Sequence, residues 1–206
     1  MKMFSHIAIL ALLLDSSLPA QERVILPAQD GVTRGSGGSI KTDLGYGIML
    51  NEKSSLEREW ITIHDDSILA NLIGTVGVRT VYESGKNYSS ASLRYKVDYK
   101  IVIKEPLAAI EVRFLTFDIW GDHVNTLSTT EIVHMETGEN PRFDAEWNIF
   151  SDNETIEHYA SIAWIAKVRT KSGRVIKADH KKVLDEAVKF SKEFEQIDLE
   201  PKPKDK

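Results

Sequence analysis

Residues 93–103 read Leu-Arg-Tyr-Lys-Val-Asp-Tyr-Lys-Ile-Val-Ile, and every odd-numbered position in this stretch carries an apolar or aromatic side chain. Because side chains alternate between the two faces of a strand, the pattern predicts a β-strand with one face buried. Burying that face contributes roughly 9 to 18 kcal/mol. Fixing the backbone costs about 11 to 22 kcal/mol. The strand therefore needs hydrogen-bonded neighbours and a second layer over its apolar face.

Other stretches with alternating or β-branched and aromatic residues predict further strands. They cover residues 60–64, 75–82, 110–120, 129–135, 143–150, 159–170 and 174–178. Turn residues separate them and no helical period lies between them. The sequence therefore predicts a mainly β chain folded as an antiparallel β-sandwich, with one domain over residues 57–178.

Two of these stretches carry more specific information. Ile162 to Ala166 has no polar face, which favours a central strand covered on both sides. In residues 110–120 the apolar positions change phase at Phe114-Leu115, and a β-bulge there would produce that change. Trp147 and Trp164 lie within apolar patterns, so we expect both in the core, with Trp164 and its neighbours facing residues 93–103.

The chain changes character after residue 178. Apolar residues at steps of three and four predict an amphipathic α-helix over residues 179–197, with Asp179 as its N-cap. These residues are Val183, Ala187, Phe190, Phe194 and Ile197. The stripe is too short for a coiled coil, so we expect it to dock on the sandwich; the alternative is a partner protein. Residues 198–206 are charged and contain prolines, which predicts a disordered tail.

The N-terminus predicts export. Lys2, an apolar run from Ile7 to Leu14, and a small residue at Ala20 are typical of a cleaved secretory signal peptide over residues 1–20. Leu26-Pro27-Ala28 repeats Leu18-Pro19-Ala20, so cleavage after Ala28 is the second option, and a buried N-terminal strand is the alternative to a signal. We expect a secreted or periplasmic protein without a membrane span. Residues 21–56 are rich in glycine and predict a flexible segment.

Composition excludes several kinds of chemistry. The chain has no cysteine, which excludes disulfides, thiolate metal sites and cysteine nucleophiles. Its formal charge of −5 argues against nucleic acid as the principal partner. We therefore expect a partner that is another protein or a component of the cell envelope.

The order of several motifs resembles the FxLYD-type immunoglobulin-like domains of exported bacterial proteins. The matching positions are Phe114-Leu115-Thr116-Phe117-Asp118, Gly121, Val124, Gly138-Glu139 before Phe143, and Val168-Arg169 before Gly173. The resemblance covers residues 95–176 and departs from the family pattern at Thr116, where leucine is usual, and at Phe117, where tyrosine is usual. It implies an immunoglobulin-like fold that serves as an exported accessory or interaction module, and it implies no catalytic residue.

We find no motif that predicts a catalytic, cofactor or metal site. His64-Asp65-Asp66 is the densest group of metal-ligating residues, but it lacks the spaced acidic loop of a calcium site, and a turn in which aspartates bond the local backbone is favoured. The histidines show no zinc spacing, and no serine lies in Gly-x-Ser-x-Gly. The carboxylates considered for glycoside hydrolysis point to solvent by alternation; they are Glu111, Asp118, Glu131 and Glu146.

Trp120 and His123 are the candidate partner contacts. Trp120 precedes Gly121 at an expected turn, where an indole can anchor a partner or fold back as a lid on the sandwich end, and we favour the lid. We predict an exported non-catalytic accessory or interaction module without a cofactor. The alternative is a cell-envelope hydrolase or carbohydrate-binding protein.

Overall fold

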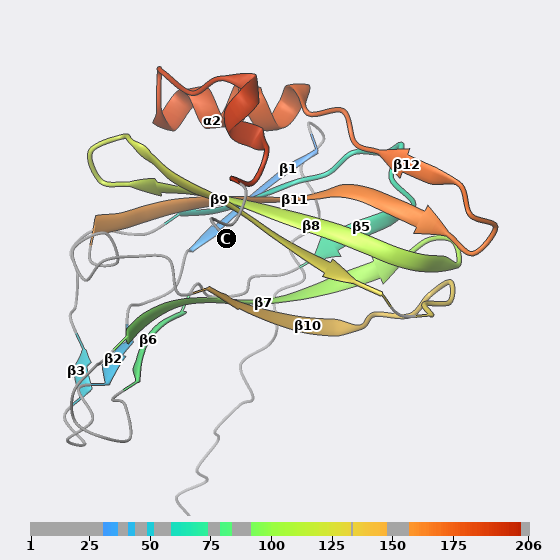
Figure 1. Ribbon diagram of the computed structural model, residues 1–206, viewed down its shortest axis with the longest axis horizontal. Coiled ribbons are helices and arrows are strands. Elements are labelled where there is room, and N and C mark those ends of the chain that lie inside the picture. Colours follow the sequence, from blue (N-terminus) through green and yellow to red (C-terminus); the bar gives the residue numbers. More distant parts are fainter. Residues whose placement is uncertain are drawn as a thin grey trace, which may run out of the picture.

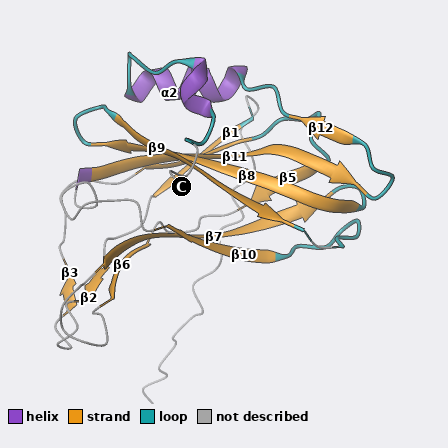
Figure 2. Cartoon of the chain, in the orientation of Figure 1, coloured by secondary structure: helices purple, strands orange, loops and turns teal. Residues whose placement is uncertain are grey.

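The protein is mainly β, with a helical segment near its C-terminus (Figure 2). The structure is a computed structural model that describes residues 31–36, 41–43, 49–51, 59–73, 79–83, 92–132, 134–147 and 157–202. The described elements are β1 (Val32–Ser36), β2 (Lys41–Asp43), β3 (Met49–Asn51), β4 (Glu59–Ile63), β5 (Ala70–Ile73), β6 (Arg79–Glu83), β7 (Ser92–Ile103), β8 (Leu107–Asp118), β9 (His123–Glu131), β10 (Arg142–Trp147), β11 (His158–Thr170), β12 (Val175–Lys177), α2 (Lys181–Phe190) and the 3₁₀-helix η1 (Gln196–Leu199). The predicted signal peptide lies outside the described residues.

The strands form two facing layers, and α2 covers the outer side of one of them (Figure 1). The first layer is a six-stranded sheet in the order β1-β4-β11-β8-β9, with β12 paired to β11. The second is a four-stranded sheet in the order β10-β7-β5, with β6 paired to β7. Strands β2 and β3 pair with each other as a separate ribbon. Within the described residues, no helix is long and apolar enough to cross a membrane.

The six-stranded sheet is mixed, which corrects the predicted antiparallel arrangement. Strand β4 runs parallel to β11, with Glu59 opposite Ala160 and Ile63 opposite Trp164. The other strand pairings in the described part of the chain are antiparallel. Alternation specifies which face of a strand is buried but not its direction. A tight turn would force an antiparallel pair, whereas β4 and β11 lie far apart in the sequence and are free of that constraint.

Strand β7 builds the core between the two sheets, as its sequence predicts. Tyr95, Val97, Tyr99 and Ile101 are each fully buried there. The prediction that Trp164 packs against this row is wrong, because Trp164 lies on the face of β11 that is turned towards α2. Ala163 and Ile165, its neighbours, face β7 instead, together with Val112 and Phe114 of β8. The central strand β11 is therefore covered on both sides, as predicted.

Strand β8 continues through Phe114 and Leu115 without the predicted bulge. Both residues keep regular register with β11 and with β9. Val112 and Phe114 pack in the core between the sheets, whereas Leu115 and Phe117 pack on the side of α2. The apolar phase changes because the second face of β8 is also buried. The register shift between β8 and β9 lies two residues later, between Thr116 and Phe117.

Helix α2 docks on the six-stranded sheet, in agreement with the expectation, but it is shorter than predicted. It ends at Phe190, and its N-cap is His180 rather than Asp179. Asp179 nevertheless accepts a hydrogen bond from the Lys181 amide through Oδ1, at 3.0 Å. Val183 and Ala187 are buried against the sheet. After the helix the chain turns, so that Phe194 reaches the same apolar cluster from outside the helix.

Residues 198–200 are anchored to the sheet, which corrects the predicted start of a disordered tail at residue 198. Leu199 is only 1% exposed, and its carbonyl accepts a hydrogen bond from Arg113 Nη1 at 3.0 Å. Glu200 forms an ion pair with Arg113 Nη2 at 2.8 Å. We call residues 179–202 the C-terminal strap. The local composition is polar, and it is Arg113, far away in the sequence, that holds the segment in place.

The glycine-rich segment over residues 21–56 also contains ordered structure. Strand β1 forms an edge of the six-stranded sheet by antiparallel pairing with β4, from Val32 opposite Ile63 to Ser36 opposite Glu59. The strand was missed because Gly35 and Ser36 interrupt any apolar alternation. Its backbone groups bond to β4, and this tertiary pairing overrides weak local propensity.

Candidate interaction site at the turn between β8 and β9

The turn between β8 and β9 is held by the carboxylate of Asp118. Oδ1 of Asp118 accepts the backbone N–H of Trp120 at 2.9 Å and that of Asp122 at 2.9 Å. Gly121 has a φ of 92°, a left-handed conformation that glycine adopts without strain. The backbone of the turn is therefore fixed by hydrogen bonds rather than by burial of its own side chains.

Trp120 projects into solvent from this turn, and the predicted lid is wrong. Its side chain is 72% exposed, and the preceding Ile119 is 42% exposed. On the neighbouring part of β8, Phe117 stacks on Phe190 of α2 with ring centroids 5.2 Å apart, so the aromatic packing under α2 is completed without the indole. The turn thus presents two adjacent apolar side chains on an ordered backbone.

The turn rests on the C-terminal end of α2. A β-carbon placed on Gly121 would lie 2.9 Å from the backbone carbonyl oxygen of Phe190, which is closer than real contacts permit. The carbonyl cannot move aside freely, because it belongs to the packed end of α2. The turn cannot either, because Asp118 bonds its backbone. The position of the exposed indole is therefore coupled to docking of the strap.

Replacing Gly121 with alanine is expected to lower the free energy of unfolding by about 1 to 3 kcal/mol, because the left-handed backbone and the close approach to Phe190 both oppose a β-carbon. Gly138→Ala is the matched control. Gly138 has a similar φ of 85°, but a β-carbon added to it would meet no atom within 4 Å, so it reports backbone strain alone. Urea denaturation of both variants measures the difference. Equal losses would show that the contact with Phe190 contributes nothing.

His123, the second predicted contact, faces the strap instead of solvent. Its ring packs edge-on against Phe194 with centroids 4.9 Å apart, and Nε2 lies 3.0 Å from the Thr126 hydroxyl. Burial lowers the pKa of His123, and the nearby Asp198 carboxylate offsets this only in part. A groove of about 220 Å³ lies beside it. The groove is lined by His123, Thr126, Ile197, Asp198, Glu200, Pro201 and Lys202.

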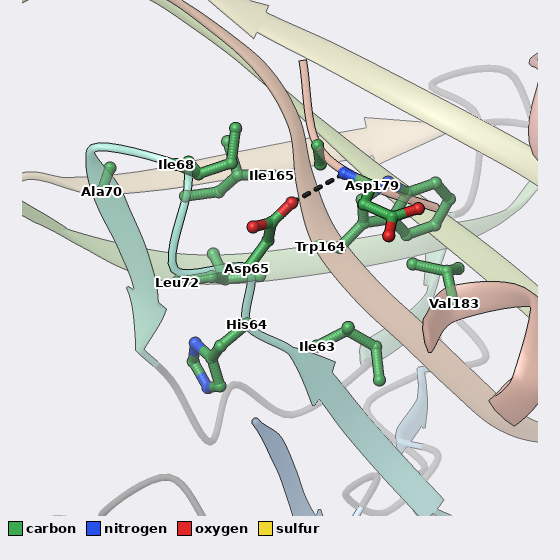
Figure 3. Close-up of a pocket in the computed structure, with 11 residues that line it drawn as sticks. Ile63, His64, Asp65, Ile68, Ala70, Leu72, Trp164, Ile165, Asp179 and Val183 are labelled. Atoms are coloured by element: carbon green, nitrogen blue, oxygen red, sulfur yellow. Dashed lines mark hydrogen bonds between the residues drawn. The ribbon is translucent and has the colours of Figure 1, made fainter. Parts of the chain in front are cut away.

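Asp65, in the turn after β4, bonds backbone amides, as the sequence favours. Asp65 accepts a hydrogen bond from the Ser67 amide at 2.8 Å. It accepts another from the Asp179 amide at 2.7 Å (Figure 3). Burial acts to raise the pKa of Asp65, but the hydrogen bonds outweigh it and the pKa lies below its ordinary value. The adjacent cavity of about 10 Å³ holds a single water molecule at most. Among the described residues, no group of three or more histidine, aspartate or glutamate side chains is arranged to hold a metal ion.

A buried serine–histidine pair was missed from the sequence. Ser161 Oγ lies 3.0 Å from His158 Nε2 and 2.5 Å from the Tyr95 hydroxyl. A register shift between His158 and Ala160 lets residues at an odd spacing on β11 approach each other, so no sequence periodicity could have signalled the pair. All three residues lie in the interior, and Ser161 is fully buried. The geometry is that of a structural hydrogen-bond network, since a nucleophile requires access to its substrate.

The carboxylates considered for hydrolysis have separate positions. Glu111 bonds Arg113 at 2.7 Å and Lys167 at 2.5 Å, on the side of the strap. Asp118 orders the turn, and Glu131 accepts a hydrogen bond from Tyr99 at 3.0 Å. Glu146 is exposed on β10, in the other sheet. The structure therefore assigns these groups to different places rather than to one facing pair.

No family model and no curated protein matches the chain. A solved structure of a hypothetical protein from Peptoclostridium difficile 630 is similar over 58% of this chain and 91% of that chain, with 7% sequence identity and a TM-score of 0.40. A likeness at this level carries no argument about fold or function.

Proposed function

We propose that this protein is an exported, non-catalytic interaction module that binds a partner protein through the turn between β8 and β9. The observation that carries the proposal is Trp120, which is 72% exposed on a turn whose backbone is ordered by Asp118. Tryptophan is one of three residue types, with tyrosine and arginine, that are enriched among side chains that dominate binding energy at interfaces. A turn that is already ordered also avoids the entropic cost of being fixed on binding.

Other features support the remaining parts of the proposal. Export is supported by the apolar run from Ile7 to Leu14 before Ala20. An immunoglobulin-like sandwich is supported by two sheets that share one core, and by the resemblance of residues 114–118 to the FxLYD motif. The net charge of −5 favours a protein or another envelope component over nucleic acid as the partner.

A cell-envelope hydrolase is the alternative, and the Ser161–His158 pair is the observation that would favour it. Nucleophilic catalysis needs the serine, its base and an open substrate position within reach of one another. Ser161 and Tyr95 are fully buried and His158 is 3% exposed. An interaction module therefore fits the described residues better than a hydrolase.

Site-specific cross-linking tests the proposed surface. We expect a photo-reactive benzoylphenylalanine at Trp120, introduced into the full chain in native cells, to cross-link one protein species. The same group at Ile132 should not capture that species. Ile132 is the matched control because it is 79% exposed but lies at the far end of β9. With the purified partner, Trp120→Ala should weaken binding by roughly tenfold or more, and Ile132→Ala should leave binding unchanged.

Three outcomes would contradict the proposal. Equal labelling from both positions would show that the contact is not specific to the turn. An unchanged dissociation constant for Trp120→Ala would show that the indole is not part of the interface. Labelling of a glycan instead of a protein would assign the exposed indole to carbohydrate binding.

A further inference from the structure

The C-terminal strap belongs to a separate apolar layer of the molecule. Val183, Ala187, Phe194 and Leu199 pack on the outer face of the six-stranded sheet. The core between the two sheets is built from other residues, of which β7 contributes a fully buried row. Figure 1 shows the same division, with α2 outside both sheets. Undocking of the strap therefore removes no residue from the inner core.

Polar contacts fasten the strap at three places along its length. The Asp179 amide donates to Asp65 at its start. Glu186 pairs with Arg34 of β1 at 2.5 Å in the middle of α2. At its end Glu200 pairs with Arg113 of β8, and Arg113 also bonds Glu111. Each fastening uses ionisable groups, so docking of the strap depends on their protonation.

His180 follows Asp179, whose amide makes the first of these contacts, and one nitrogen of its ring is unsatisfied. Its Nε2 is buried and has no hydrogen-bond partner among the described residues, and the same holds for Nε1 of Trp164, whose ring centroid is 6.1 Å away. The charged groups that act on the imidazole are Arg113 of β8, Glu200 at the strap end, the adjacent Asp179, and Asp65 after β4. Protonation of His180 would place a second cation near Arg113. The nearby carboxylate of Glu200 is already paired with Arg113.

His123 of β9 packs against the other end of the strap. Its ring lies between Phe194 of the strap and Phe117 of β8, with centroid distances of 4.9 and 5.7 Å. The Thr126 hydroxyl beside it donates to the carbonyl of Asp198. The charged groups acting on this imidazole are Asp198 and Lys202. Protonation would charge a ring that is packed among aromatic side chains.

We propose that the C-terminal strap is an acid-sensitive cover, which undocks from the six-stranded sheet as the pH falls below neutrality while the core between the sheets stays folded. The two histidines are the sensors, and the apolar face formed by residues such as Leu115, Phe117 and Ile162 is what the strap uncovers.

The direction of the pH dependence follows from the pKa shifts. Burial lowers the pKa of His180 and of His123 below the ordinary value of 6.5. Because the docked state favours the neutral rings, docking is strongest above pH 6.5 and weakens as the pH falls through 6.5 towards the lowered pKa values. The carboxylates of Glu186 and Glu200 have pKa values below the ordinary 4.5. Their contribution is lost only as the pH falls below that ordinary value, so the histidines respond first.

Burial likewise lowers the pKa of His64, with Lys104 and Lys182 acting in the same direction and Asp66 opposing them. Lys182 belongs to α2, so protonation of His64 would add repulsion at the start of the strap. This effect has the same sign as that of the two sensors and reinforces it.

Amide hydrogen exchange of the full chain at pH 7.5 and pH 5.5 tests the proposal, after correction for intrinsic exchange rates. Residues 181–199 are expected to lose protection by roughly fivefold or more at the lower pH, whereas β7 and β10 keep theirs. His180→Gln and His123→Gln should each reduce that loss, since glutamine does not titrate. His134→Gln is the matched control, because His134 is exposed. A hydrophobic dye should bind more at pH 5.5 in the unmodified chain.

The remaining outcomes overturn the proposal. Equal protection of the strap at both pH values would show that it does not respond to acid. Simultaneous loss of protection in β7 would mean that the whole domain unfolds. If His134→Gln had the same effect as His180→Gln, protonation of His180 would not be what undocks the strap.

Discussion

Replacing Val97 with aspartate is expected to abolish folding. Val97 is fully buried in the middle of β7, opposite Ala145 of β10 and facing the core between the sheets. An unpaired carboxylate there loses its hydration without gaining a partner, which costs several kcal/mol. Because domains are stable by only about 5 to 15 kcal/mol, this substitution removes most or all of the stability. Circular dichroism and urea titration of the purified variant measure the loss.

Val175→Asp provides the matched control, because it makes the same chemical change on a strand. Val175 is 51% exposed on β12, so its carboxylate remains hydrated and the free energy of unfolding should change by less than about 1 kcal/mol. Similar midpoints for the two variants would show that β7 is not the core strand.

Ending the chain after Ala178 is expected to produce the second largest effect. The truncation removes Val183, Phe194 and Leu199, each of which contributes roughly 1.5 to 3 kcal/mol by burial, and uncovers the apolar residues beneath them. It also leaves Arg113 without Glu200 and without the Leu199 carbonyl. We expect the unfolding midpoint to fall by about 10 °C or more. The truncated chain should bind a hydrophobic dye and associate with itself, because an exposed apolar sheet face is an association surface.

A chain that ends after Lys202 is the control, since it keeps the whole strap and all the contacts described for it. Its midpoint and dye binding should equal those of the full chain. If the chain ending at Ala178 were as stable as this control, the strap would contribute nothing to the fold. If the shorter chain failed to fold at all, the strap could not be a separable cover, which would also contradict the acid-sensitive undocking.

The strand positions could be predicted from the sequence where one face is apolar and the other polar. Residues 93–103 show this best, because strict alternation specifies both the element and its buried face. Strand β8 shows the limit of the same reasoning. Its apolar phase change at Phe114 and Leu115 predicts a bulge, because a sequence pattern does not reveal whether a second layer covers the other face.

The candidate site was predictable only as a pair of residues. Gly121 identified a turn and placed Trp120 beside it, but the exposure of the indole could not be inferred, because the turn lies against the Phe190 carbonyl of α2, which is far away in the sequence. His123 is close to Trp120 in the sequence, yet it packs against Phe194 of the strap. The two candidates therefore have different surroundings, which proximity in the sequence cannot indicate.

Three features could be predicted from local sequence patterns: the chain is mainly β, the odd-numbered face of β7 is buried, and a helical segment follows the last strand. These follow from local periodicity, since each depends on residues only a few positions apart. Local patterns did not predict that β4 runs parallel to β11, that β1 joins the sheet, or that Arg113 holds the strap through Glu200. Each of these depends on partners far apart in the chain, and the pairing of backbone groups and buried charges between them leaves no periodic trace in the sequence.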